Sequence, residues 1–366
     1  MNAASAIARR PPLEKAADPP IRLLIVDDST IARAVLSRML GADPDFEIAA
    51  VAGNADQALE QLKSVRVDIV LLDVEMPGGS GLDALPVILE AGAGARVLIV
   101  SSMADDGAET TVRALALGAA DTLPKPGSSY FAGRFSRVLA DRIRRIGRAS
   151  RRAEATPTRK DAIRLRTMPE GPIGCIALGA STGGLHALIE FLRALPPAIG
   201  APLLVTQHLP PIFMSHFARQ LEAAAGRRAI VAGHGQRLID DVVHIAPGDA
   251  HLCVERNAAG EIRARLDRTR ASSNCLPSVD PMLASVADLY GDAAVGIVLS
   301  GMGRDGLAGA RRLAERQGTV LAQDQASAAI WGMPRAVAEA GLASAVLPPP
   351  DLARRIALRA KGCAWK

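Results

Sequence analysis

The chain has 366 residues, more than a typical single domain, so we expect two folded domains. Hydrophobic residues make up 49% of the chain and charged residues 22%, which excludes a disordered protein and supplies enough apolar side chains for two cores. No apolar run reaches the ~20 residues of a membrane span, and the first 20 residues lack the apolar segment of a secretory signal. We therefore expect residues 1–20 to be a disordered extension of a cytoplasmic protein without membrane insertion.

The cysteines and the net charge narrow the class of protein further. The four cysteines lie far apart and form no C-x-x-C pair, which argues against a zinc site or a disulfide framework and fits a reducing compartment. The net charge of +5 would suit a nucleic-acid ligand, but the basic excess falls within one stretch, residues 141–170. We assign this stretch to a basic linker between two domains and expect no nucleic-acid ligand.

Residues 21–140 alternate apolar, strand-like runs with amphipathic helical stretches. The strands are expected at Ile21–Val26, Phe46–Val51, Val67–Leu72, Arg96–Val100 and in a short run before Lys125. Five β/α units of this kind predict an N-terminal five-stranded parallel doubly wound domain, with helices on both faces of the sheet.

Reactive side chains follow these strands at one predicted edge of the sheet. Asp27 and Asp28 follow the first strand, and Asp73 follows the third. Ser101 follows the fourth strand, and Lys125 closely follows the fifth. Because sites in such folds lie at the carboxyl ends of the strands, we expect the five side chains to converge. Helix capping or an exposed turn would explain any one of the acids alone, but not five residues at matching strand ends.

The chemistry of this group indicates a metal ion and a phosphoryl group. Three carboxylates at adjacent strand ends repel one another unless a cation lies among them, and Mg2+ prefers such oxygen ligands. Asp73 can then act as a nucleophile that accepts a phosphoryl group. The Lys125 ammonium and the Ser101 hydroxyl can both bind the oxygens of that group.

A second α/β pattern predicts a C-terminal domain over residues 171–350, followed by a C-terminal tail over residues 351–366. Its strands are expected at Ile173–Leu178, Pro202–Gln207 and Ala293–Ser300. The intervening residues 243–265 form short alternating segments that read as hairpins. We therefore predict an α/β Rossmann-like domain with an added hairpin region.

The Gly-rich run after the first of these strands places a serine in a nucleophile pattern. Residues 179–184, Gly-Ala-Ser-Thr-Gly-Gly, fit G-x-S-x-G around Ser181. The glycines permit a sharp strand-to-helix turn that exposes the Ser181 hydroxyl and directs backbone N–H groups at an oxyanion. A phosphate-binding loop is the alternative, but the run lacks a following lysine and the G-x-G-x-x-G spacing.

A nucleophilic serine needs a base, and the base needs an acid that orients it. His208 ends the strand next in sequence and is the favoured base, with His186 on the intervening helix as the second choice. Asp305 lies in a Gly-rich loop after another strand and is the expected acid. Because the order Ser, His, Asp differs from that of α/β-hydrolases, we expect a different fold carrying the same roles. The remaining histidines are interpreted as surface or hairpin residues: His216, His234, His244 and His251.

The N-terminal domain resembles response-regulator receiver domains. The motifs that carry the resemblance are Asp27-Asp28, the run from Leu72 to Pro77, Ser101-Ser102 and Lys125-Pro126. The resemblance implies that a histidine kinase phosphorylates Asp73. It also implies that Asp28, Asp73 and the backbone carbonyl of Glu75 hold Mg2+ beside Asp27. Receivers usually carry an aromatic residue three positions before the lysine, whereas this chain has Thr122, so its switching route is expected to differ.

The C-terminal domain resembles the catalytic domain of chemotaxis protein-glutamate methylesterases. Besides the Gly-rich run, the matching motifs are Gln-His-Leu-Pro at 207–210, His-Ile-Ala-Pro-Gly at 244–248, Pro-Ser-Val-Asp at 277–280, Gly-Met-Gly-Arg-Asp-Gly at 301–306, Ala-Gln-Asp at 322–324 and Gly-Met-Pro at 332–334. The resemblance implies Ser181 as nucleophile, His208 as general base and Asp305 as orienting acid. It further implies the Met302 backbone N–H as an oxyanion donor. Members commonly carry arginine before Pro-Ser-Val-Asp, where this chain has Leu276.

The implied reaction is hydrolysis of glutamate γ-methyl esters on chemoreceptor helices to glutamate and methanol. Deamidation of receptor glutamines is implied as a second activity, and no cofactor is implied at the esterase site. We expect a monomer whose partners are methylated chemoreceptors and a chemotaxis histidine kinase.

Two alternatives belong to other classes of function. The C-terminal domain could bind a partner without catalysis, or the basic linker could bind DNA. A linker without a reader helix gives only salt-sensitive, non-specific DNA binding. We favour an esterase controlled by the N-terminal domain, because two reactive groups of unrelated chemistry share one chain.

Overall fold

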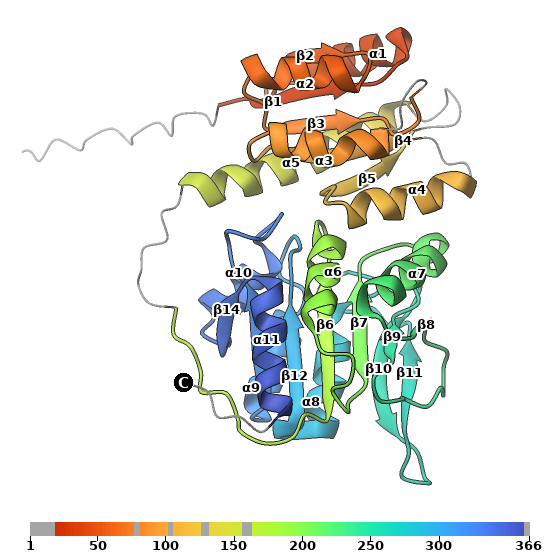
Figure 1. Cartoon of the computed structure of the whole chain (residues 1–366), viewed down its shortest axis with the longest axis vertical. Coiled ribbons are helices and arrows are strands. Elements are labelled where there is room, and N and C mark those ends of the chain that lie inside the picture. Colours follow the sequence, from red (N-terminus) through yellow and green to blue (C-terminus); the bar gives the residue numbers. More distant parts are fainter. Residues whose placement is uncertain (1–18, 77–80, 102–104, 126–131, 156–162, 362–366) are drawn as a thin grey trace, which may run out of the picture.

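The computed structural model describes residues 19–76, 81–101, 105–125, 132–155 and 163–361, which form two α/β domains stacked end to end (Figure 1). No helix within these ranges is both long and apolar enough to cross a membrane. The predicted extension, residues 1–20, lies almost wholly outside the described residues.

The N-terminal domain is the predicted five-stranded parallel sheet, in the order β2-β1-β3-β4-β5. Its strands are β1 (Ile21–Val26), β2 (Phe46–Ala52), β3 (Ile69–Leu72), β4 (Arg96–Ser101) and β5 (Asp121–Pro124). Its helices are α1 (Thr30–Gly41), α2 (Ala55–Ser64), α3 (Gly81–Ala91), α4 (Asp105–Ala116) and α5 (Ala132–Ala155). The central strand β3 has the sequence Ile-Val-Leu-Leu, and all four of its side chains are buried, as expected for a parallel strand covered on both faces. The fold prediction for this half is confirmed.

Helix α5 continues far beyond the predicted end of this domain at residue 140. Leu139, Ile143 and Ile146 recur at helical spacing and are buried against the sheet, which keeps the chain helical through the arginines. Arg144 donates to Asp45 at 2.6 Å and also pairs with Asp43, so part of the basic stretch lies on a folded helix rather than in a linker. Residues 156–162 of the predicted linker lie outside the described part of the chain.

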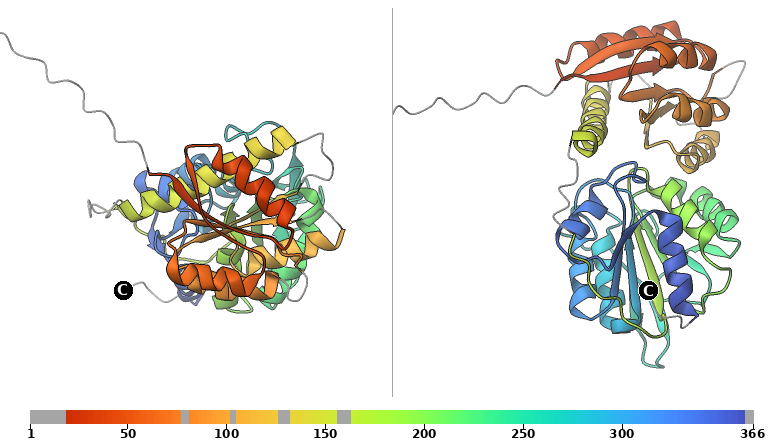
Figure 2. Two further views of the ribbon diagram at one scale, coloured as in Figure 1. Left: turned by 90° about the horizontal axis from the view of Figure 1, so that it is seen from above. Right: turned by 60° about the vertical axis from the view of Figure 1, so that its left-hand side comes forward.

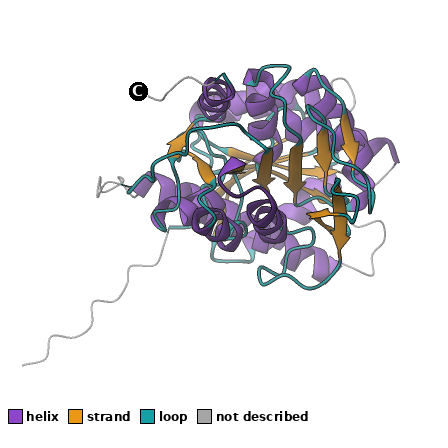
Figure 3. Ribbon diagram, turned by 90° about the horizontal axis from the view of Figure 1, so that it is seen from below, coloured by secondary structure: helices purple, strands orange, loops and turns teal. Residues whose placement is uncertain are grey.

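The C-terminal domain is built on a seven-stranded parallel sheet with the order β14-β13-β12-β6-β7-β9-β8. Its strands are β6 (Cys175–Ala180), β7 (Leu203–Gln207), β8 (Ala229–Val231), β9 (Val243–Ile245), β12 (Ala294–Val298), β13 (Thr319–Gln323) and β14 (Ala345–Leu347). Helices cover both faces of this sheet (Figure 3). They are α6 (Gly184–Ala194), α7 (Met214–Ala225), α8 (Val279–Tyr290), α9 (Leu307–Glu315), α10 (Met333–Glu339) and α11 (Pro349–Ala360), with short 3-10 turns η2 (Pro211–Phe213) and η3 (Gly291–Ala293).

The added hairpin is also present, because β10 (His251–Arg256) and β11 (Ile262–Asp267) form a separate antiparallel pair. The predicted tail is instead mostly helix α11, which packs on α6 through Leu352, Ala353 and Ile356. Arg359 anchors the end of α11 by donating to the Asp292 carbonyl at 2.9 Å and to Thr319 Oγ1 at 2.7 Å. The domain continues past residue 350 because the apolar residues of α11 recur at helical spacing and pack on α6.

The two domains meet along α4, which lies over α6 and α7 (Figures 1 and 2). The Gly183 N–H donates to the Ala120 carbonyl at 2.8 Å, and His186 Nδ1 lies 3.0 Å from the Ala116 carbonyl. At the rim, Arg219 donates to Glu109 at 3.1 Å. The loop that carries the candidate nucleophile is therefore in direct contact with the N-terminal domain.

Candidate active site

Ser181 lies in the turn between β6 and α6, at the carboxyl edge of the C-terminal sheet. Its N–H donates to the Ser300 carbonyl at 3.0 Å, which holds the turn against the end of β12. Gly183 has a φ of 70°, and a Cβ there would lie 2.2 Å from the Ala329 Cβ. Only glycine fits this left-handed, crowded position, so the glycine after the serine is required by the turn itself.

Three side chains form a hydrogen-bonded chain at this edge. His208 Nδ1 lies 3.0 Å from Ser181 Oγ, and His208 Nε2 lies 2.8 Å from Asp305 Oδ2. Ser181 follows β6 and His208 follows β7, while Asp305 lies in the loop after β12, so three neighbouring strands each contribute one residue. With a proton on Nε2 donated to Asp305, the lone pair of Nδ1 is free to accept from the serine hydroxyl. The structure thus brings together all three residues expected from the sequence.

Asp305 is buried and accepts hydrogen bonds from two close donors besides the histidine. Ser278 Oγ donates to Oδ1 at 2.7 Å, and the Val279 N–H donates to Oδ2 at 2.8 Å. Ser278 is fixed in turn because its own N–H donates to His251 Nδ1 at 2.8 Å. Burial alone would raise the pKa of Asp305, but the hydrogen bond and charge of His208 and these donors hold its pKa well below the ordinary value. Asp305 is therefore an anion at neutral pH.

The electrostatics of His208 follow from the same contacts. Burial by itself would lower the pKa of His208, but the Asp305 carboxylate and the Cys275 sulfur favour the protonated ring and raise its pKa to about 9. Ligand atoms of His208, Cys275 and Asp305 all lie within 4.8 Å of one another. Cys275 was not among the residues expected at the site, because nothing in its spacing distinguishes it.

The serine opens into a cavity of about 370 Å³ that both domains line. Met302 and Gly303 of the loop after β12 lie on its catalytic side, together with Ser181 and His208. On the opposite side, the N-terminal domain contributes a wall of residues from α4, the connection to β5, β5 itself and α5: Leu115, Ala120, Asp121, Arg142, Arg145 and Ile146. Access to Ser181 is therefore restricted by the N-terminal domain.

A second reactive group lies in the N-terminal domain, as the sequence predicts. Asp27, Asp28 and Asp73 offer carboxylate oxygens within 4.8 Å of one another. Lys125 Nζ lies 2.8 Å from Asp27 Oδ2 and 2.6 Å from Asp73 Oδ2. Burial alone would lower the pKa of Lys125, but these two carboxylates raise it above the ordinary value, so Lys125 is a cation. Glu75 donates its N–H to Asp73 Oδ1 at 3.1 Å, which fixes the loop after β3.

The three oxygen ligands and their clustering suit a hard cation such as Mg2+. Ser101 is the last residue of β4, where its backbone pairs with Pro124 of β5; its side chain lies outside the described part of the chain.

Comparisons with known proteins identify both domains. Residues 176–356 match the family model of CheB methylesterases, and residues 23–130 match that of response regulator receiver domains. The chain is 41% identical over 349 residues to protein-glutamate methylesterase/protein-glutamine glutaminase 2 of Caulobacter vibrioides, covering 94% of this chain and all of that protein. It belongs to the CheB methylesterase family. A relative from a Nocardioides species carries the same methylesterase/glutaminase description at 39% identity, covering 93% of this chain and 96% of its own.

A solved structure is also similar. The catalytic domain of Thermotoga maritima CheB methylesterase covers 51% of this chain and 98% of its own, with 33% identity and a TM-score of 0.49.

Two of the remaining histidines are buried. His244 was predicted to be a surface or hairpin residue, but it lies in β9 of the parallel sheet, where the Ile239 N–H donates to it. His251 lies in the hairpin strand β10, as predicted, and the Ser278 N–H donates to its Nδ1. His186, the second choice as base, contacts the Ala116 carbonyl and lies 3.7 Å from Glu190, at the interface between the domains. The Pro-Ser-Val-Asp motif was the available signal for Ser278, but its role depends on the loop that brings it to Asp305.

Proposed function

We propose that this chain is a phosphorylation-activated protein-glutamate methylesterase that hydrolyses γ-methyl esters of glutamate on chemoreceptors. The observation that carries the proposal is the hydrogen-bonded chain from Ser181 through His208 to Asp305 in a cavity shared by the two domains. The names of the relatives support the substrate class and support deamidation of glutamine as a second reaction. The receiver family supports control by phosphorylation.

In the first step, Ser181 Oγ attacks the ester carbonyl carbon while His208 Nδ1 takes the hydroxyl proton. The C–O bond to the methoxy group then breaks, and the proton passes from His208 to the departing oxygen, which releases methanol. The product is a glutamyl ester of Ser181. We assign the Met302 backbone N–H as a donor to the oxyanion, because Met302 lines the cavity beside the serine.

In the second step, His208 takes a proton from water, and the resulting hydroxide attacks the glutamyl carbonyl. The bond to Ser181 Oγ breaks, the proton returns to that oxygen, and the free glutamate leaves. With a glutamine substrate, ammonia leaves in place of methanol in the first step. Asp305 keeps the proton of the neutral ring on Nε2 and stabilises the imidazolium in both steps.

The pH dependence of hydrolysis should report His208. The base must be neutral to accept a proton, and the pKa of the ring is raised to about 9, so most of the free enzyme is inactive at neutral pH. We expect kcat/KM for a neutral ester to rise about tenfold per pH unit below pH ~9 and to level off above it. A profile that is flat between pH 7 and 9 would contradict this assignment.

A matched pair of variants tests whether Cys275 contributes to the raised pKa of His208. Cys275→Ala removes a partner that favours the protonated ring, so the acid limb should move to lower pH with the plateau rate nearly unchanged. Cys253→Ala removes a different cysteine, which is buried in β10, and should leave the profile in place.

We further propose that a histidine kinase phosphorylates Asp73, and that Asp27, Asp28, Asp73 and the Glu75 carbonyl hold Mg2+. The ion would neutralise the carboxylates and the incoming phosphoryl oxygens. Lys125 already contacts Asp73 and can bind the same oxygens, and we assign Ser101 to the same role. The route to the esterase runs through β5 and α5, because Arg142 bonds both the Asp121 carboxylate and the Thr122 carbonyl. Threonine at position 122 lacks the aromatic ring usual in receivers.

Asp73→Asn should leave the esterase at its basal rate and make it insensitive to acetyl phosphate with Mg2+. The amide is isosteric with the carboxylate but cannot accept a phosphoryl group. Methanol release from a methylated receptor, measured with and without acetyl phosphate, tests this in both proteins. Activation of the Asp73→Asn protein by the phosphodonor would show that control does not depend on this aspartate.

A further inference from the structure

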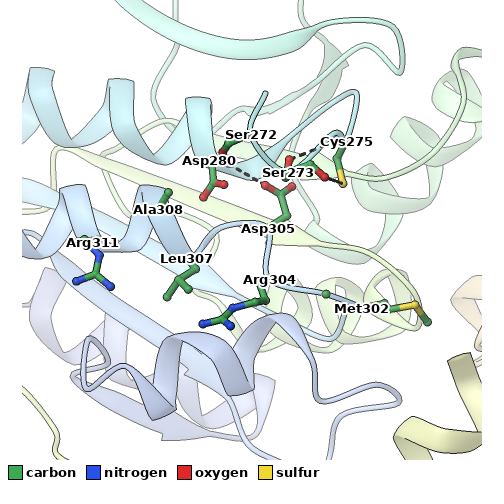
Figure 4. Close-up of a pocket in the computed structure, with 11 residues that line it drawn as sticks. Ser272, Ser273, Cys275, Asp280, Met302, Arg304, Asp305, Leu307, Ala308 and Arg311 are labelled. Carbon is green, nitrogen blue, oxygen red and sulfur yellow. Dashed lines mark hydrogen bonds between the residues drawn. The ribbon is translucent and has the colours of Figure 1, made fainter. Parts of the chain in front are cut away.

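A second pocket lies beside the triad, and the described residues that line it all belong to the catalytic domain. It has a volume of about 400 Å³, and Figure 4 shows its lining side chains. Cys275, Met302 and Gly303 line both this pocket and the serine cavity, so the two spaces adjoin. Of the receiver residues that the structure describes, none lines the second pocket, whereas six of them line the serine cavity.

Two arginines define the chemistry of this pocket. Leu307 and Arg311 are four residues apart and share a face of α9, and Arg304 precedes that helix (Figure 4). Neither guanidinium forms a hydrogen bond or an ion pair with any residue that the structure describes, and both side chains are exposed. By contrast, the adjacent Arg312 on α9 is paired with Asp288 at 2.7 Å. Two unpaired guanidinium groups at one pocket favour an anionic ligand, such as a carboxylate, whose two oxygens lie in the plane of the guanidinium group.

The carboxylates already in the pocket do not occupy these arginines. Asp280 Oδ1 accepts from the Gly309 N–H of α9 at 2.9 Å, and Asp305 is bonded to His208, Ser278 and Val279. Both acids are therefore committed to internal partners, and the arginines face the pocket uncompensated.

We propose that Arg304 and Arg311 form a subsite for the carboxylate of an acidic side chain that neighbours the methyl ester on the substrate. This inference rests on the proposed function, since the ester must enter the adjoining serine cavity. Each round of hydrolysis itself creates a carboxylate on the substrate. The subsite would therefore favour esters that lie beside a glutamate already demethylated, so that hydrolysis at one position promotes hydrolysis at the next.

The test uses helical peptides with one glutamate γ-methyl ester and either Glu or Gln one helical turn before or after it. With the full chain activated by acetyl phosphate and Mg2+, we expect a KM about tenfold lower for the Glu peptide at one of these positions, at equal kcat. The double variant Arg304→Gln with Arg311→Gln should lose this preference. Its hydrolysis of p-nitrophenyl acetate, a neutral ester, should be unchanged, which verifies that the triad is intact.

Arg312→Gln is the control for Arg311, because it removes one positive charge from the same helix outside the pocket, and it should keep the preference. Arg304→Glu should reverse the preference toward a peptide with Lys at the neighbouring position. The proposed subsite is contradicted if the wild-type chain shows no preference for the Glu peptide at either position. It is also contradicted if that preference survives in the double variant.

Binding of the product peptides separates this inference from the proposed function. If no methyl ester is hydrolysed, the proposed function fails, but the Glu and Gln product peptides can still be compared by equilibrium titration. Tighter binding of the Glu peptide that is lost in the double variant supports the subsite in that case. Equal binding of the two peptides would overturn it.

Discussion

Ser181→Ala is expected to reduce hydrolysis of glutamate γ-methyl esters by on the order of 10⁶-fold, as the loss of a nucleophile does in serine hydrolases. His208→Ala should cost a similar factor, because Ser181 Oγ lies 3.0 Å from His208 Nδ1 and depends on it for deprotonation. Residues that act as a unit lose activity together, so the double variant should be scarcely worse than either single one. Methanol release from a methylated receptor is the measurement.

Asp305→Asn tests the third member of the chain. The amide can keep a hydrogen bond but favours the wrong tautomer of His208, and an effect on the order of 10⁴-fold is expected. Leu276→Ala, an exposed change in the same loop region as Cys275, serves as a folding control and should keep the triad active. Hydrolysis within tenfold of the wild type in the Ser181→Ala protein would remove Ser181 from the mechanism.

Removing the receiver domain is expected to raise the basal rate. Receiver residues wall one side of the cavity at Ser181, which has a volume of about 370 Å³. Because a substrate helix is ~10 Å across, we expect that this wall must move before the helix reaches the serine. A fragment starting at about Pro169 should hydrolyse receptor esters roughly 5- to 150-fold faster than the unphosphorylated full chain, the range of typical coupling free energies. A slower fragment would mean that the receiver is an activator.

A single substitution in the full chain tests inhibition by the receiver domain without deleting that domain. Glu109→Arg breaks the contact of α4 with Arg219 and places like charges across the interface. Because exposed ion pairs contribute only ~0–1 kcal/mol, a rise in basal rate of a few-fold is expected. Glu60→Arg breaks a comparable exposed pair with Lys63, away from this interface, and should leave the rate unchanged.

Much of the fold follows from the sequence, because both sheets are parallel and their strands are buried apolar runs. In such sheets the residue after each strand reaches the same edge, so Ser181, His208 and Asp305 could be grouped before any coordinates. The acids around Asp73 could be grouped for the same reason. Local sequence is enough to predict these positions at the strand ends, and the structure places the residues close to where they were predicted.

Other features depend on contacts that local sequence does not encode. The sequence predicts a linker at the arginines of α5, because their high charge outweighs the apolar spacing in that stretch. Leu139, Ile143 and Ile146 nevertheless recur at helical spacing and bury one face of the helix. The contact of Gly183 with the Ala120 carbonyl joins two domains, and the hydrogen bond from Ser278 to Asp305 joins two distant loops. Long-range packing determines these contacts, and a single sequence does not indicate which distant residues will meet.

The most direct test of the central claim is methanol release from a γ-methyl-glutamyl receptor by the full chain with acetyl phosphate and Mg2+. We expect methanol and new glutamate carboxylates to appear in equal amounts, at a rate well above that without phosphodonor, and to be absent with the Ser181→Ala protein. Equal release by the wild-type and Ser181→Ala proteins, or no release by the activated wild type, would contradict the account.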